Sequence, residues 1–177
     1  NIWEDEFFTR EDFKEVIENT LNETQKMLFR QNKVIDYAYE FNNRRFRINI
    51  YMIYKGYGMA IRLINDNVKP IENFYQQKVL RDILHNDNGL ILICGATGTG
   101  KSTTLASMIE YINQNKSKHI ITLEEPIEYV FTNKKSLIHQ REYHVDFENF
   151  SEAIKMAMRQ DPDVIMVGEI RDTETMK

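Results

Sequence analysis

Residues 90–102 constrain the fold more strongly than any other part of the chain. An apolar run, Leu90-Ile-Leu-Ile-Cys94, leads directly into Gly95-Ala-Thr-Gly-Thr-Gly-Lys101-Ser102. The pattern G-x-x-x-x-G-K-[ST] is typical of a loop between a strand and a helix whose backbone N–H groups cradle phosphate. We therefore expect a strand over residues 90–94 and a helix that begins near Lys101, both belonging to a parallel α/β sheet.

Each residue type in this loop has a defined chemical use. The glycines let the backbone curve so that several N–H groups face phosphate oxygens, and the helix that follows adds the positive end of its dipole. The Lys101 ammonium group reaches the β- and γ-phosphates, and the Ser102 hydroxyl can ligate Mg²⁺. The predicted nucleotide-binding residues are Gly95, Thr97, Gly98, Thr99, Gly100, Lys101, Ser102 and Thr103.

Composition narrows the class of protein. The net charge of −4 and the pI of about 5.6 give no strong basic field to attract nucleic acid. Cys94 is the only cysteine, which excludes a disulfide within the chain and a cysteine zinc cluster, and its place at the end of an apolar run predicts a buried, inert thiol. No apolar stretch reaches the length of a membrane span and no signal peptide is visible, so a cytosolic protein fits. The start without methionine and the stop just after a motif lead us to expect that both ends are incomplete.

Hydrophobic periodicity divides the chain into two expected domains. We predict a small α+β domain over residues 1–66 and a parallel sheet covered on both faces over residues 67–177, joined by the polar stretch that ends at Pro70. Helices are expected over 9–19, 23–30, 74–84, 101–113 and 149–159, and strands over 36–41, 45–52, 58–63, 90–94, 119–123 and 164–167.

Local signals support several of these elements. Thr9 with Asp12, and Asn149 with Glu152, have the spacing of helix-capping pairs. The Asn42-Asn43 pair predicts a two-residue hairpin turn. Other side chains are expected to face a core, namely Met59, Ile61 and Leu63 in one strand and Phe150, Ala153, Ile154, Ala157 and Met158 in the last helix.

Two acidic segments follow predicted strands. One is Leu123-Glu-Glu-Pro-Ile-Glu128, and the other is Asp161-Pro-Asp-Val-Ile-Met-Val-Gly-Glu169-Ile-Arg-Asp172. The carboxyl ends of strands in open α/β sheets are where ligands bind, so both segments are well placed for hydrolysis. The second resembles a Walker B segment, although Gly168 stands where many families have aspartate. Hydrolysis needs a magnesium partner and a carboxylate that orients water, and these segments offer both.

Two arginines outside this region also point to an anion. If the hairpin turn after residue 52 centres near Tyr54 and Lys55, then Arg47 and Arg62 face each other on the polar side of the sheet. Like charges directly opposite one another are unfavourable unless an anion lies between them, and a phosphate group would supply that anion.

The combined motifs resemble the secretion and type IV pilus ATPases, which are hexameric motors. The matching segments are the phosphate loop, an acidic box at 123–130 (LEEPIEYV), the Walker B segment at 161–172 and FRINIY at 46–51, and together they span about residues 34–177. The stretch from His139 to Asp146, followed by Phe150 to Ala153, is similar to the branch that retracts pili. The alternatives within the family are a pilus-extension or type II secretion assembly ATPase.

The resemblance implies roles for matching positions. Glu128 would be the catalytic glutamate that polarises water, and Glu169 the Walker B acid that acts on Mg²⁺ through water. Lys155 stands where the family has a second arginine beside Arg159, and lysine lacks the bidentate contact of a guanidinium. Glu125 replaces the more usual aspartate. The implied catalytic set is Glu128, Glu169, Lys101, Arg47, Arg62 and Arg159, with Ser102 and Glu169 serving Mg²⁺ and the two N-terminal arginines closing over the phosphates.

The resemblance also implies an architecture and partners. We expect a RecA-like P-loop ATPase domain preceded by a truncated, PAS-like α+β domain, ATP with Mg²⁺, a homo-hexamer, and a membrane-embedded pilus platform protein at the cytoplasmic face. Nucleic acid is not an expected partner. A GTPase switch is disfavoured because Asn133-Lys-Lys-Ser136 lacks the aspartate of the guanine-reading motif. A nucleic-acid motor is disfavoured by charge, and an inactive regulatory subunit by the intact Lys101, Glu128 and Glu169. The histidines at 119, 139 and 144 lack metal-ligand spacing.

Overall fold

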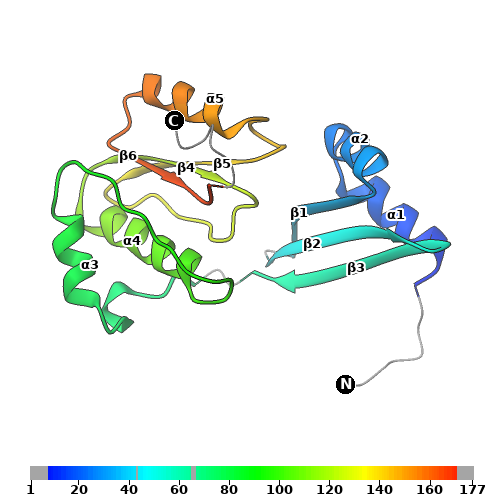
Figure 1. The fold of residues 1–177 in the computed structure, drawn as a ribbon, viewed down its shortest axis with the longest axis horizontal. Coiled ribbons are helices and arrows are strands. Elements are labelled where there is room, and N and C mark those ends of the chain that lie inside the picture. Colours follow the sequence, from blue (N-terminus) through cyan, green and yellow to red (C-terminus); the bar gives the residue numbers. More distant parts are fainter. Residues whose placement is uncertain (1–7, 43, 65–66, 171–177) are drawn as a thin grey trace. The chain divides into compact units, whose positions relative to one another are not determined.

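The structure, a computed structural model, describes residues 8–42, 44–64 and 67–170. The chain divides into two compact units, Asn1–Ile64 and Asn65–Lys177 (Figure 1). We call these the N-terminal unit and the C-terminal unit and describe each by itself.

The N-terminal unit packs two helices on one face of an antiparallel sheet. The elements are α1 (Arg10–Thr20), α2 (Glu23–Asn32), β1 (Val34–Phe41), β2 (Arg44–Ile53) and β3 (Gly56–Leu63), with strand order β1-β2-β3. Thr9 caps α1 in a reciprocal capping box with Asp12, as predicted, and Asn22 caps α2 in the same way. The buried core of this unit consists of Ile17, Leu21, Phe29, Ile35, Tyr37, Ile48 and Ile50.

The edge strand β3 is less buried than the sequence predicted. Met59 packs against the core, but Ile61 and Leu63 are 57% and 54% exposed, so their predicted burial is wrong. The buried core side chains come from the helices, their connection, β1 and β2, and the end of β3 contributes none of them. The predicted Asn42-Asn43 turn falls partly on Asn43, which lies outside the described residues.

The C-terminal unit is a parallel sheet with helices on both faces (Figure 1). Its elements are η1 (Ile71–Asn73), α3 (Gln77–Leu84), α4 (Lys101–Asn115), β4 (His119–Glu124), β5 (Leu137–Glu142), α5 (Phe150–Ala157), η2 (Met158–Gln160) and β6 (Val164–Val167), and the strand order is β5-β4-β6. On the central strand β4, Ile120 faces the α3–α4 core, whereas Ile121 and Leu123 face α5. The predicted parallel sheet covered on both faces is therefore confirmed.

The largest error concerns residues 90–94, which are not a strand. Leu90, Ile91 and Leu92 are 82%, 41% and 62% exposed, and Cys94 is exposed rather than buried. A strand is stabilised by hydrogen bonds to a neighbouring strand, and within the described chain no strand pairs with this run. An apolar composition alone therefore did not specify the element.

Other boundaries also differ from the prediction. The expected helix over 74–84 begins only at Gln77, after a separate 3-10 turn, and α5 ends at Ala157, which leaves Met158 68% exposed. Strand β5 was not predicted, because its α4-facing positions include the polar residues Gln140 and Glu142. Across the described residues, no helix combines the length and the apolar character that crossing a membrane would require.

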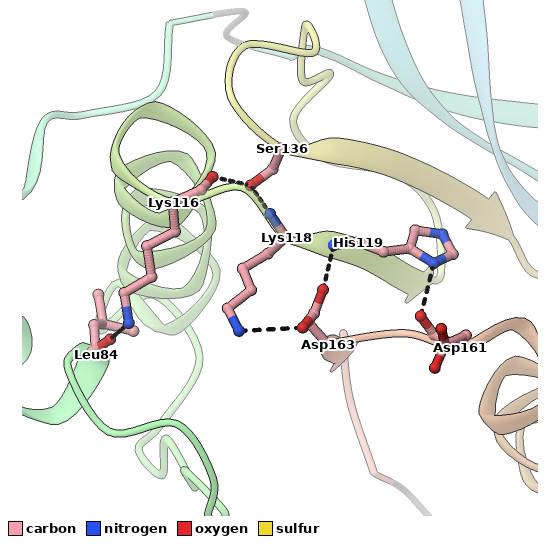
Figure 2. A network of polar contacts seen from close by, with 7 residues as sticks. All are labelled: Leu84, Lys116, Lys118, His119, Ser136, Asp161 and Asp163. Carbon is pink, nitrogen blue, oxygen red and sulfur yellow. Dashed lines mark hydrogen bonds and ion pairs between the residues drawn. The ribbon is translucent and has the colours of Figure 1, made fainter.

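Side-chain hydrogen bonds fix the end of the sheet where the strands begin (Figure 2). The Asp163 carboxylate accepts the backbone N–H of His119 at 2.8 Å and the ammonium of Lys118 at 3.1 Å, which joins the start of β6 to the start of β4. The Ser136 hydroxyl donates to the Lys116 carbonyl at 2.6 Å and accepts the Lys118 N–H at 3.2 Å, which ties the start of β5 to the end of α4. These hydrogen bonds therefore hold the N-terminal ends of β4, β5 and β6 together at one edge of the sheet.

Asn113, which is fully buried on α4, organises the loop that leads into β5. Its amide nitrogen donates to the Thr132 carbonyl at 2.9 Å and to Glu110 at 3.0 Å, and its amide oxygen accepts the Lys134 N–H at 3.0 Å. One side chain therefore supplies the partners of two loop backbone groups.

Replacing Asn113 by alanine should lower the free energy of unfolding by about 2 to 4 kcal/mol, because buried backbone groups lose their partners. Asn115→Ala is the matched control, since its amide is exposed and bonds only within α4. Urea unfolding followed by circular dichroism measures both variants, and equal midpoints for the two would contradict the role of Asn113.

Candidate nucleotide-binding and hydrolysis site

Two glycines of the predicted phosphate loop have a left-handed backbone conformation, and the helix that follows begins at Lys101 as expected. Gly98 and Gly100 have φ values of 81° and 92°, in the left-handed region that glycine adopts at little cost. Gly100 is the N-cap of α4, and no side chain caps this helix end. The N–H groups of the first turn are therefore oriented for an anion, and the dipole of a 15-residue helix favours negative charge there.

The Lys101 and Ser102 side chains lie at the start of α4. The Lys101 ammonium donates to the carbonyl oxygens of Gly95 and Ala96, each at 3.0 Å, so it is folded over the loop. Ser102 lies exposed on the first turn of α4. The ammonium of Lys101, the hydroxyl of Ser102 and the N–H groups at the start of α4 are the groups that bind a triphosphate with Mg²⁺ in loops of this sequence. No side chain of the protein caps these N–H groups.

A contact joins the phosphate-loop helix to the first acidic segment. The hydroxyl of Thr103, in the first turn of α4, lies 3.2 Å from the hydroxyl of Tyr129. Tyr129 directly follows Glu128, which is half-buried. The structure thus brings the segment that carries Glu128 beside the helix that begins at Lys101.

A buried carboxylate that was not singled out from the sequence lies at the end of β4. Glu124 is 6% exposed, and its Oε1 accepts the Thr122 hydroxyl at 2.6 Å and the Gln140 amide at 3.1 Å. The backbone N–H of Glu128 also bonds to this carboxylate. The only sequence signal was its position two residues after Thr122, on the same face of the strand.

Strand β6, within the second acidic segment, ends at the same edge of the sheet as β4. Leu123 and Val167 are register partners, and the Gly168 N–H donates to the Leu123 carbonyl at 2.8 Å. A Cβ atom at Gly168 would lie 3.3 Å from that carbonyl oxygen and 3.4 Å from the Cα of Glu124, so a larger residue would fit tightly here. Glu169 follows and is half-buried.

Among the arginines, the facing pair in the N-terminal unit was correctly anticipated. Arg47 on β2 and Arg62 on β3 are register partners. The Arg47 guanidinium also binds the Asp36 carboxylate of β1, with its Nη2 2.8 Å from Oδ2. Arg62 is exposed on the same face.

Arg159 and Lys155 are not brought to Glu128 and Glu169. Lys155 is exposed in the last turn of α5 and Arg159 is exposed in η2, which precedes β6. Arg159 therefore lies before the start of β6, whereas Glu128 follows the end of β4 and Glu169 the end of β6. In the described part of the chain, no group of three or more His, Cys, Asp or Glu side chains is arranged to hold a metal ion by itself.

The buried carboxyl at the end of β4 has a consequence for stability. Burial raises the pKa of Glu124 above its ordinary value of 4.5, reinforced by the charge of Glu128 and opposed by the hydrogen bonds from Thr122, Gln140 and the Glu128 backbone. The folded chain therefore holds this proton more tightly than the unfolded chain. The stabilisation is fully present below pH 4.5 and is lost as the pH rises through the folded-state pKa.

Glu124→Gln should remove this dependence. We expect the stability of the wild type relative to the variant to fall by about 1.4 kcal/mol per pH unit between the unfolded and folded pKa values. Urea unfolding midpoints measured from roughly pH 4 to pH 8 test this. A difference that is constant or rises with pH would contradict the raised pKa.

Comparison with known proteins places these features in a family. A family model described as "Type II/IV secretion system protein" matches residues 23–177. The chain is 41% identical over 167 residues to the "Twitching motility protein" of Neisseria gonorrhoeae, covering 94% of this chain and 45% of the relative. It is 41% identical over 163 residues to the "Type IV pilus retractation ATPase PilT" of Pseudomonas aeruginosa, covering 92% and 47%.

A solved structure gives the same result at the level of the fold. The crystal structure of the pilus retraction motor PilT with bound ADP matches with a TM-score of 0.85 and 42% identity, over 94% of this chain and 49% of that one. The chain spans about half the length of the relatives it matches. With a sequence typical of a phosphate loop, Glu128 and Glu169 following neighbouring parallel strands and these similarities, the chain belongs to the type II/IV secretion system protein family.

Proposed function

We propose that this chain carries the ATP-hydrolysing machinery of a type IV pilus motor, in the branch that retracts the pilus. The observation that carries the proposal is the contact between Thr103 and Tyr129, which places the acidic segment beside the phosphate-loop helix. The similarity to a twitching motility protein and to a pilus retraction ATPase supports this choice of motor.

In the proposed reaction, water attacks the γ-phosphorus of ATP, the bond from that phosphorus to the bridging oxygen breaks, and ADP and phosphate are released. Lys101, Ser102 and the loop N–H groups hold the triphosphate, and Glu128 orients the water and accepts its proton. Ser102 and Glu169 would hold Mg²⁺. Bound Mg²⁺ would supply positive charge opposite the phosphate oxygens.

We further propose that residues 67–177 form part of a RecA-like domain and residues 1–66 part of a PAS-like domain. Arg47 and Arg62 would close over the phosphates: they face each other across β2 and β3, and although the Asp36 carboxylate binds Arg47, the exposed Arg62 guanidinium adds a second positive charge on the same face. Arg159, at the opposite end of β6 from Glu169, is assigned to the site of a neighbouring copy in a hexamer. The hexamer would act on a platform protein at the cytoplasmic face of the membrane.

Glu128→Gln in the complete protein should leave MgATP binding nearly unchanged and lower the ATP turnover rate at least about 100-fold, because the amide cannot accept a proton. Glu152→Gln, the same change at an exposed position in α5, is the control. Phosphate release and nucleotide titration measure both properties. Full turnover by Glu128→Gln would overturn the site assignment.

Lys101→Ala should instead weaken MgATP binding by about 10- to 100-fold, since it removes a charge-assisted contact to phosphate. Lys78→Ala, at an exposed position on α3, serves as the control. Titration with a fluorescent ATP analogue distinguishes them, and unchanged affinity in Lys101→Ala would contradict the proposed phosphate loop.

Arg62→Ala tests the N-terminal unit. Removing one of two facing guanidinium groups relieves repulsion, so the unfolding midpoint should stay the same or rise slightly, while ATP turnover falls at least about tenfold. Arg44→Ala, exposed on the same sheet, is the matched control. Turnover equal to that of the control would remove Arg62 from the mechanism.

A further inference from the structure

Side chains of β5 hold the backbone on both sides of Glu128. The Glu142 carboxylate accepts the Ile127 N–H at 3.1 Å. The Gln140 amide nitrogen donates to the Tyr129 carbonyl at 2.8 Å, and its amide oxygen accepts the Phe131 N–H at 2.8 Å. Residues 127, 129 and 131 are thus bound to β5, and Glu128 lies between the first two of these positions.

Gln140 contributes most of this restraint. Besides its two contacts with the segment, its nitrogen donates to Glu124 Oε1 at 3.1 Å, so both amide hydrogens and the amide oxygen are engaged. Gln140 is the register partner of Thr122, which donates to the same carboxylate oxygen. The amide therefore links the end of β4 to the segment that follows it.

The contacts of Gln140 require an amide. It must donate twice, to a carboxylate and to a carbonyl, and accept once from a backbone N–H. A carboxylate at this position could not donate and would face Glu124, and an aliphatic side chain could do neither. None of its contacts reaches the phosphate loop directly.

We propose that Gln140 is a positioning residue for Glu128: its amide fixes the 127–131 backbone so that the Glu128 carboxylate is held where it can orient water. This inference rests on the proposed function of Glu128. A displacement of about 1 Å at a reacting group can cost roughly 100-fold in rate, whereas ground-state binding by the phosphate loop does not depend on that placement. Gln140 therefore acts on turnover and not on nucleotide affinity.

The test uses two variants in the complete protein. Gln140→Met keeps a similar volume without hydrogen bonds, and Gln140→Glu keeps the shape but removes both N–H donors. Each should lower kcat at least about tenfold while the dissociation constant for MgADP changes less than about threefold. Turnover is expressed per nucleotide-binding site counted by titration, so that unfolded molecules do not contribute.

A pH series separates positioning from a general loss of structure. In Gln140→Glu, the new carboxyl lies beside the Glu124 carboxylate that Gln140 contacts, with Glu142 two positions further along the same strand, and once protonated it regains one O–H donor. Its deficit in kcat relative to the wild type should therefore shrink as the pH is lowered, whereas the deficit of Gln140→Met should not. Hydrogen exchange at the Phe131 amide should be faster in Gln140→Met, because its acceptor is gone.

Gln76→Glu is the control, since Gln76 is exposed and makes no side-chain cap at α3. If both Gln140 variants keep kcat within about twofold of this control while Glu128→Gln abolishes turnover, the inference is wrong and the proposed function stands. Parallel losses of kcat and MgADP affinity would also overturn it, because a purely structural role moves both. Full turnover by Glu128→Gln would overturn the proposed function and this inference together.

Discussion

The parallel pairing of β4 with both β5 and β6 is the constraint on which the rest of the C-terminal unit depends. Because the three strands run in one direction, the segments that follow β4 and β6 leave the sheet at one edge. The hydrogen bonds of Asp163 and Ser136 fix the common origin of these strands at the other edge. Glu128 and Glu169 are separated by 41 positions along the chain but follow neighbouring strands.

A cluster of buried polar side chains fixes the position of the segment that follows β4 at this edge of the sheet. Thr122, Glu124, Gln140 and Glu142 lie on the α4-facing side of β4 and β5, and both carboxylates are 6% exposed. Burying such groups is costly unless their hydrogen bonds are satisfied, and here the partners come largely from the segment that carries Glu128. The folding of the sheet and the placement of that segment therefore depend on the same contacts.

The features that were predictable from sequence are those encoded by local chemistry. The cap at Thr9, the start of α4 and the facing of Arg47 and Arg62 follow from capping, glycine conformation and strand register. The strand expected over residues 90–94 was wrong and β5 was missed, because strand formation depends on a partner far away in the chain. Gln140 gave no signal, since its importance comes from contacts with residues 124, 129 and 131 that only the fold creates.

Trapping of a transition-state analogue tests most directly whether the site that contains Glu128 hydrolyses ATP. The complete protein is loaded with MgADP, with or without aluminium fluoride, and the release of a fluorescent ADP analogue is timed. We expect aluminium fluoride to slow release at least about 100-fold in the wild type and to have little effect in Glu128→Gln. The complex of MgADP with aluminium fluoride mimics the phosphoryl group during transfer, and it binds tightly only where Glu128 orients the attacking water. Release that is equally fast with and without aluminium fluoride, or equally slowed in both proteins, would contradict the assignment of Glu128 to hydrolysis.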